Sequence, residues 1–152
     1  MRQDEIGINL ETSLGYLLKE TSSALRLAME SVLRPLGMTV THYSCLELLA
    51  QRPGLSNSEL ARGTFVTRQS MNVLLKGLER HGYVTRPAEA PAGRILPTRL
   101  TPLGRQSLGK ATVAVRSVET RMLAGMSEDE TASALKTLRR MSHALQDGNE
   151  GA

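Results

Sequence analysis

Residues 56–104 read SNSELARGTFVTRQSMNVLLKGLERHGYVTRPAEAPAGRILPTRLTPLG. Ser56 and Glu59 form a capping-box pair, in which each side chain accepts a backbone N–H at the start of a helix. We therefore expect a helix from Asn57, which is short because Gly63 interrupts it and the following Thr-Phe-Val run has poor helix propensity. A short helix followed by a turn is the first half of a helix-turn-helix.

A second helix is predicted over residues 67–81. Thr67 is a favourable N-cap residue, and the apolar residues after it recur at helical spacing and form one buried stripe. The stripe consists of Met71, Leu74, Leu75 and Leu78, and the other face carries Arg68, Gln69, Asn72 and Lys76. Arg, Gln and Asn match the edges of guanine and adenine, and a recognition helix meets bases with its first turn. We therefore expect base contacts from Arg68, Gln69 and Asn72, and phosphate contacts from Thr67 and Lys76.

After Gly82 the pattern changes from helical to extended, which predicts a hairpin wing over residues 83–100. Pro97 lacks a backbone donor, so the returning strand is confined to an edge or a bulge. Arg94 lies near the tip of the wing, where it either enters a minor groove or stays an ordinary exposed arginine. The other basic residues of the wing, Arg86 and Arg99, are expected to contact phosphate, with a structural role as the alternative for Arg86.

Positive charge is concentrated in this segment. Residues 62–105 hold eight of the 19 Lys and Arg residues but two of the 15 acids, an excess of +6 within a chain of net charge +4. The rest of the chain is therefore slightly acidic. A positive excess confined to one segment is the electrostatic footprint of a phosphate-binding surface. A winged-helix protein-interaction module, the alternative without DNA binding, would not need this charge.

The same segment resembles the DNA-binding lobe of the MarR family of bacterial regulators. The resemblance is carried by LExxGxVxR at residues 78–86 and LTxxG at residues 100–104. Members often carry Asp-x-Arg at the wing, whereas residues 92–94 here are Ala-Gly-Arg, so the basic tip is kept without its bracing acid. The resemblance implies a homodimer that binds an inverted-repeat operator in double-stranded DNA. It also implies a repressor relieved by a small aromatic or phenolic inducer.

Apolar stripes at helical spacing flank the lobe. The N-terminal helix is expected to end at Gly37, and its stripe consists of Leu14, Leu17, Leu18, Leu25, Val32 and Leu33. Thr101 and Pro102 open a further helix as N-cap and N1 residues, and Ser127 with Glu130 opens the last helix as a capping box. These stripes are too long for the small lobe to cover, so we expect them to pack against a second subunit.

The predicted fold class is therefore mainly α with a small β-hairpin wing, a winged helix-turn-helix with N- and C-terminal dimerisation helices. We expect one compact unit with four parts: a dimerisation region at 1–37, the winged lobe at 38–101, C-terminal dimerisation helices at 102–147 and a flexible tail at 148–152.

Few residues are candidates for a regulatory trigger. Tyr16, His42 and Tyr43 are candidates to line an inducer site, although each is equally suited to a core or interface position. Cys45 is the single cysteine and has no partner for an intramolecular disulfide. His42, three residues earlier, would activate it as a redox sensor, but a buried and inert cysteine is the commoner case.

Other classes of protein lack support in the sequence. The three histidines are scattered, and there is no metal-ligand spacing, phosphate loop or nucleophile elbow. We therefore expect no enzyme activity, cofactor or metal site. No apolar run approaches the ~20 residues of a membrane span, and the N-terminus lacks the apolar segment of a signal peptide. A cytoplasmic, nucleoid-associated protein is expected.

Overall fold

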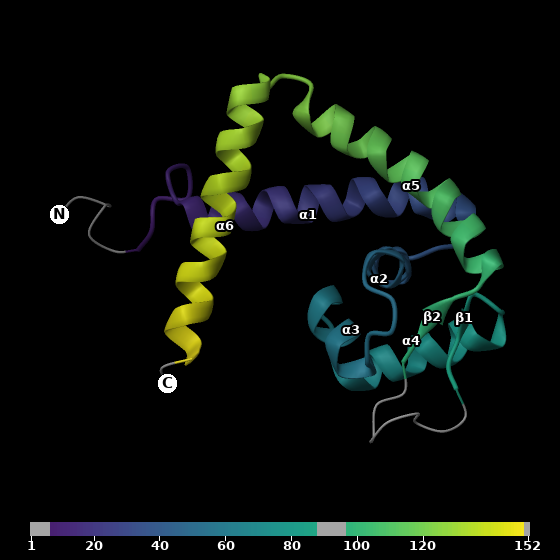
Figure 1. The fold of residues 1–152 in the computed structure, drawn as a ribbon. Helices are drawn as coiled ribbons and strands as arrows, with labels where there is room; N and C mark the ends of the chain where they lie inside the picture. Colours follow the sequence, from purple (N-terminus) through teal and green to yellow (C-terminus); the bar gives the residue numbers. More distant parts are fainter. Residues whose placement is uncertain (1–6, 88–96, 151–152) are drawn as a thin grey trace. The chain divides into compact units, whose positions relative to one another are not determined.

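The computed structural model describes residues 7–87 and 97–150, with side chains up to residue 147. The chain divides into two compact units, Met1–Val118 and Glu119–Ala152, where one unit was expected. In chain order the elements are α1 (Leu14–Leu33), the 3-10 helix η2 (Arg34–Leu36), α2 (Val40–Gln51), α3 (Asn57–Thr64), α4 (Arg68–Arg80), β1 (Val84–Thr85), β2 (Arg99–Leu100), α5 (Pro102–Leu123) and α6 (Glu128–Glu150) (Figure 1). The predicted class, mainly helical with a two-stranded wing, is confirmed.

The predicted caps fix the starts of α3 and α4. The Ser56 hydroxyl accepts the N–H of Glu59 at 3.2 Å, and the Glu59 carboxylate accepts the N–H of Ser56 at 3.2 Å. The Thr67 hydroxyl accepts the N–H of Ser70 at 3.0 Å and caps α4. Each of these hydrogen bonds joins residues three positions apart, so the caps are set by local sequence. The helix expected at 67–81 is confirmed.

The end of α3 differs from the expectation that Gly63 interrupts it. The helix continues through Thr64 and is closed by Phe65, which adopts the left-handed conformation with φ 62°. Gly63 serves packing instead, because a Cβ at this position would lie 2.6 Å from Leu48 Cδ1 of α2. The glycine therefore allows α3 to approach α2 closely.

The end of α1 also differs from the expected stop at Gly37. The α-helix ends at Leu33, and a 3-10 turn containing Pro35 carries the chain to Gly37, which is left-handed with φ 70°. Proline lacks the N–H that the next α-helical hydrogen bond would need, and its ring crowds the preceding turn. The tighter 3-10 turn replaces the last turn of the predicted helix.

The wing strands pair antiparallel, with Val84 opposite Leu100 and Thr85 opposite Arg99. Each strand is two residues long and lies within the predicted range of 83–100. Ahead of β2, the Thr98 carbonyl accepts the N–H of Gly54 at 3.1 Å, and this contact joins the wing to the segment after α2. The tip, including Arg94, lies outside the described residues.

The core of the first unit lies among α2, α3, α4 and the wing. Its α4 contribution is the predicted stripe, in which Met71, Leu75 and Leu78 are 3% exposed or less and Leu74 is partly buried. These side chains pack with Leu46 and other buried residues of α2 and α3. The buried stripe fixes which face of α4 remains outside.

In the second unit, α6 begins at the predicted capping box. The Ser127 hydroxyl accepts the N–H of Glu130 at 3.1 Å, and the Glu130 carboxylate accepts the N–H of Ser127 at 3.0 Å. The helix runs to Glu150, into the stretch 148–152 where a flexible tail was expected. Among the residues described, no helix combines the length and apolar character needed to cross a membrane.

Candidate functional site

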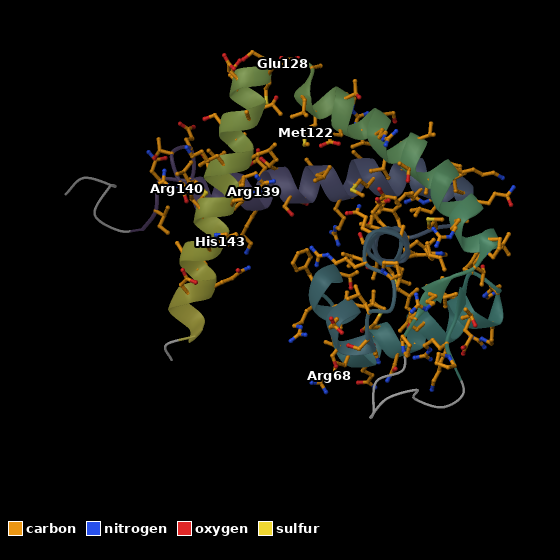
Figure 2. The ribbon with its side chains drawn as sticks, in the orientation of Figure 1. Arg68, Met122, Glu128, Arg139, Arg140 and His143 are labelled. Atoms are coloured by element: carbon orange, nitrogen blue, oxygen red, sulfur yellow. The ribbon has the colours of Figure 1, made fainter. Side chains whose placement is uncertain are left out.

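The first turn of α4 presents polar side chains to solvent. Arg68 and Gln69 are exposed directly after the Thr67 cap, and Arg68 points outward from the lobe (Figure 2). Asn72 and Lys76 are also exposed, one and two turns further along. The buried stripe holds the opposite face of α4, so the structure brings these four side chains to one solvent-facing side. This arrangement suits a helix that enters a DNA groove end first.

Asn72 has a structural contact that the sequence did not indicate. The Nδ2 of Asn57, at the start of α3, donates a hydrogen bond to Oδ1 of Asn72. The bond ties α3 to α4 and orients the Asn72 amide. Fifteen residues separate the two side chains, so no local pattern predicts the pair. A base contact by Asn72 would use its remaining Nδ2 donors.

The basic residues of the wing differ in exposure. Arg99 on β2 is exposed, whereas Arg86, directly after β1, is partly buried. The partial burial of Arg86 agrees with the structural alternative considered for it. Arg86 directly follows β1 and Arg99 is part of β2, so both belong to the wing.

Of the three proposed inducer-site residues, one lines a cavity between the start of α2 and the second half of α4. This cavity has a volume of about 330 Å³, and His42 is part of its wall. Tyr16 lies on α1 with 44% of its surface exposed, away from the cavity lining. Tyr43 lies on α2 near Glu47 and Thr112, where burial, followed by the charge of Glu47, raises its pKa. The inducer-site roles of Tyr16 and Tyr43 stay predictions.

Two further residues of this cavity, His81 and Tyr83, were not singled out from the sequence. Gly82 between them is left-handed with φ 81°, so the chain turns sharply after α4. The turn places the Tyr83 ring beside both histidines, with centroid distances of 5.7 Å to His42 and 6.4 Å to His81. The sequence His-Gly-Tyr at residues 81–83 could have predicted the turn. The proximity of Tyr83 to His42 depends on the tertiary fold.

Cys45 lies in the core. It is fully buried, and its Sγ lies 4.0 Å from the Met71 sulfur. Burial raises the pKa of the Cys45 thiol to about 12. Because the thiolate is the reactive form, these observations favour the inert cysteine over the redox sensor.

Comparison with known proteins agrees with this geometry. A sequence model of the MarR family matches residues 36–95. The HTH-type transcriptional repressor Rv2887 of Mycobacterium tuberculosis is 41% identical over 140 residues, covering 92% of this chain and 98% of the relative. The chain belongs to the MarR family. Its winged lobe is accordingly that of a DNA-binding transcriptional regulator.

Solved structures of other MarR family proteins have the same fold. The Mycobacterium tuberculosis protein Rv2887 in complex with DNA has a TM-score of 0.71 and 38% identity, covering 86% of this chain and 98% of that one. Rv2887 in complex with salicylic acid gives a TM-score of 0.71 and 40% identity, with coverage of 86% and 96%. A MarR family regulator from Silicibacter pomeroyi reaches a TM-score of 0.80 at 26% identity, with coverage of 93% and 94%.

Proposed function

We propose that this protein is a homodimeric transcriptional repressor that binds an inverted-repeat operator and is released from it by a small aromatic ligand. The observation that carries the proposal is the exposed first turn of α4, where Arg68 and Gln69 follow a fixed N-cap on a helix anchored by its opposite face. The relative Rv2887 is named a repressor and has been solved with DNA and with salicylic acid. The protein would act in the cytoplasm at the nucleoid, without enzymatic activity.

The basic and polar side chains would have two kinds of role. Arg68, Gln69 and Asn72 read base edges: the paired donors of Arg68 suit guanine, the amide of Gln69 suits adenine, and Asn72 contributes its Nδ2 donors. Thr67, Lys76, Arg86 and Arg99 contact phosphate, and Arg94, outside the described residues, enters the minor groove from the wing tip. Phosphate contacts contribute affinity without sequence preference, whereas base contacts contribute specificity.

The dimer is supported by α1. Its leucines Leu14, Leu17 and Leu18, which share one face of the helix, are between 38% and 68% exposed in the single chain. A second copy that covers this face would remove a contiguous apolar surface from water. Two equivalent recognition helices would then sit about 34 Å apart, one duplex turn, which requires an inverted repeat.

Selection from a pool of random duplexes tests the proposal. We expect an enriched inverted repeat with half-site centres about ten base pairs apart. Roughly eight phosphate contacts per dimer predict a slope near −7 for log K against log salt. Weak binding without enrichment would contradict sequence-specific regulation, and absence of binding would favour a protein-interaction module.

The selected duplex then tests the roles on α4. Gln69→Ala should cost about 1–3 kcal/mol in binding and relax the preference at one base pair. Lys76→Ala is the matched control on the same helix face, and it should weaken binding to all sequences alike. An equal loss on every sequence from Gln69→Ala would refute its base-reading role.

A further inference from the structure

The amide of Asn72 is bound to the lobe on one side and open to solvent on the other. Asn72 lies on the exposed face of α4, and its Oδ1 accepts a hydrogen bond from Nδ2 of Asn57, the first residue of α3. An amide has one acceptor oxygen and one nitrogen with two donor hydrogens. Because Oδ1 of Asn72 is turned toward α3, its Nδ2 is the branch left for solvent or for DNA.

The burial of Asn57 favours this direction of the hydrogen bond. The Oδ1 atom of Asn57 is buried and has no hydrogen-bond partner among the described residues. If both amides were turned over, Asn57 would place two N–H donors at this buried position, and each would need an acceptor. Unpaired buried N–H groups are rarer in proteins than carbonyl oxygens with unused lone pairs. Asn57 is therefore the donor and Asn72 the acceptor.

Both partners are held on a fixed backbone. The capping box of Ser56 and Glu59 sets the first turn of α3, where Asn57 lies. Asn72 directly follows Met71, which is fully buried and anchors α4 in the core. The amide of Asn72 is therefore oriented before DNA is bound, and less side-chain freedom is lost in the complex.

We propose that Asn57 is a positioning residue that turns Nδ2 of Asn72 toward DNA, so that Asn72 selects guanine over adenine. In the major groove guanine presents two acceptors, N7 and O6, whereas adenine presents the N7 acceptor beside the N6 donor. Two-point recognition of adenine needs both the oxygen and the nitrogen of one amide, and here the oxygen already accepts from Asn57. Guanine needs donors only. This inference rests on the proposed function, because it deepens base reading by Asn72 to a named base.

Single-base variants of the selected operator locate the base pair that Asn72 reads. Binding of the wild type and of Asn72→Ala is measured on each variant duplex, and the pair at which Asn72→Ala loses its preference is the one contacted. We expect a G·C pair at this position. The wild type should favour guanine over adenine there by about tenfold in each half-site, which is within the range of one specific base contact.

Modified bases test the acceptors without any change in the protein. A duplex with 7-deazaguanine at this position lacks the N7 acceptor and should bind more weakly. Inosine keeps N7 and O6 and lacks only the amino group that guanine presents in the minor groove, so it is the matched control. Binding to the inosine duplex should be close to that of the guanine duplex.

Variants of Asn57 test its control over Asn72. Asn57→Ala removes the donor, so the preference for guanine at this base pair should fall by about fivefold or more, with the preferences at other pairs unchanged. Ser58→Ala, at the next residue of α3, is the matched control and should keep the wild-type preference.

Asn57→Asp should reverse the preference. An ionised aspartate only accepts hydrogen bonds, so Asn72 should turn its Nδ2 toward α3 and its Oδ1 toward DNA. The favoured base then becomes one that presents a donor in the major groove, which is adenine or cytosine. A residue that only supports the fold would not produce this reversal.

A double variant shows whether Asn57 acts through Asn72. Asn57→Ala should cause no further change in base preference when Asn72 is already alanine, because the two effects share one contact. Thermal denaturation establishes which variants are folded. If Asn57→Asp is not folded, Asn57→Ala and the double variant retain the test.

Three results would overturn the inference. They are a wild-type preference for adenine at the pair that Asn72 reads, unchanged preferences in Asn57→Ala, or a loss of binding from Asn57→Ala that is equal on all sequences. Any of them in a protein that selects an inverted repeat refutes this inference and leaves the proposed regulator intact. A protein that selects no operator refutes the proposed function itself.

Discussion

Helices α4 and α1 carry the same kind of apolar pattern and differ in what covers it. In α4, Met71, Leu75 and Leu78 are at most 3% exposed. In α1 only Leu33 is buried, and Leu14 and Leu18 are 68% and 45% exposed. Helical spacing therefore shows that a helix has an apolar face, but the spacing does not show whether the same chain covers that face. The stripe of α4 meets α2 and α3, and the stripe of α1 is proposed to meet a second copy.

The largest effect expected from this contrast concerns Cys45, which lies under the α4 stripe. Burial raises the pKa of its thiol from 9.0 to about 12. The thiolate fraction near pH 8 should then fall by about three orders of magnitude. Modification by a disulfide reagent should be slower in the folded protein by at least that factor, since access is also blocked, and should become fast in urea.

The pH dependence has a definite sign. The pKa is raised in the folded state, so folding favours the protonated thiol and its contribution to stability is lost as pH rises above the ordinary thiol pKa. Rapid modification of Cys45 in the folded protein would contradict a closed core beneath α4. It would also restore the redox alternative.

Leu75→Ala tests the covered stripe directly. Leu75 is 0% exposed, so truncation should lower the free energy of unfolding by about 2–5 kcal/mol, because it loses apolar burial and leaves a cavity. The measurement is urea denaturation followed by circular dichroism. Val73→Ala on the same helix is the control, because Val73 is 68% exposed and should change stability by less than about 0.5 kcal/mol. Equal losses from both variants would mean that the two faces of α4 are not distinguished by burial.

Leu18→Asp tests the exposed stripe of α1. Leu18 is 45% exposed in the single chain, so the fold of the lobe should survive the substitution. In the proposed dimer a buried leucine contributes about 1.5–3 kcal/mol, so the dimer dissociation constant should rise at least tenfold. Analytical ultracentrifugation over a concentration series gives this constant. Ser23→Asp, on another face of α1, introduces the same carboxylate and the same change of charge at an exposed position and is the control. A dimer unaffected by Leu18→Asp would remove α1 from the interface.

Local patterns predicted much of this fold because the contacts involved are local. The caps at Ser56, Thr67 and Ser127 each use a partner three residues away, and all three are present. The apolar pattern of α4 also predicted its exposed polar face, because a buried stripe on one side of a helix leaves the other side exposed to solvent.

Contacts between distant residues explain what the sequence did not predict. Gly63 looked like a helix stop because its role depends on Leu48 of another helix. The hydrogen bond from Asn57 to Asn72 joins two helices, and the cavity joins His42 with His81 and Tyr83. None of these pairings has a periodic signature. They depend on how α2, α3 and α4 pack together.

The smallest expected effect concerns Phe65, an exposed apolar residue in the turn between α3 and α4. Phe65 is 93% exposed, and among the described residues it alone combines a side chain with positive φ. The left-handed conformation costs a residue with a Cβ about 1 kcal/mol, and glycine is the usual residue at this end of a helix. Phe65→Gly should therefore raise the free energy of unfolding by about 0.5–1 kcal/mol in urea denaturation.

Phe65→Ala separates the strain from the ring. It keeps the Cβ and removes the aromatic group, so it should leave stability nearly unchanged if the ring is as exposed in the dimer as in the single chain. A lower free energy of unfolding in both variants would mean that a second subunit covers Phe65, as proposed for the leucines of α1. A higher free energy of unfolding in both variants would mean that the exposed ring, rather than the backbone conformation, is the unfavourable feature. The pair of variants therefore decides whether an apolar residue uncovered in the single chain belongs to the dimer surface or to the turn alone.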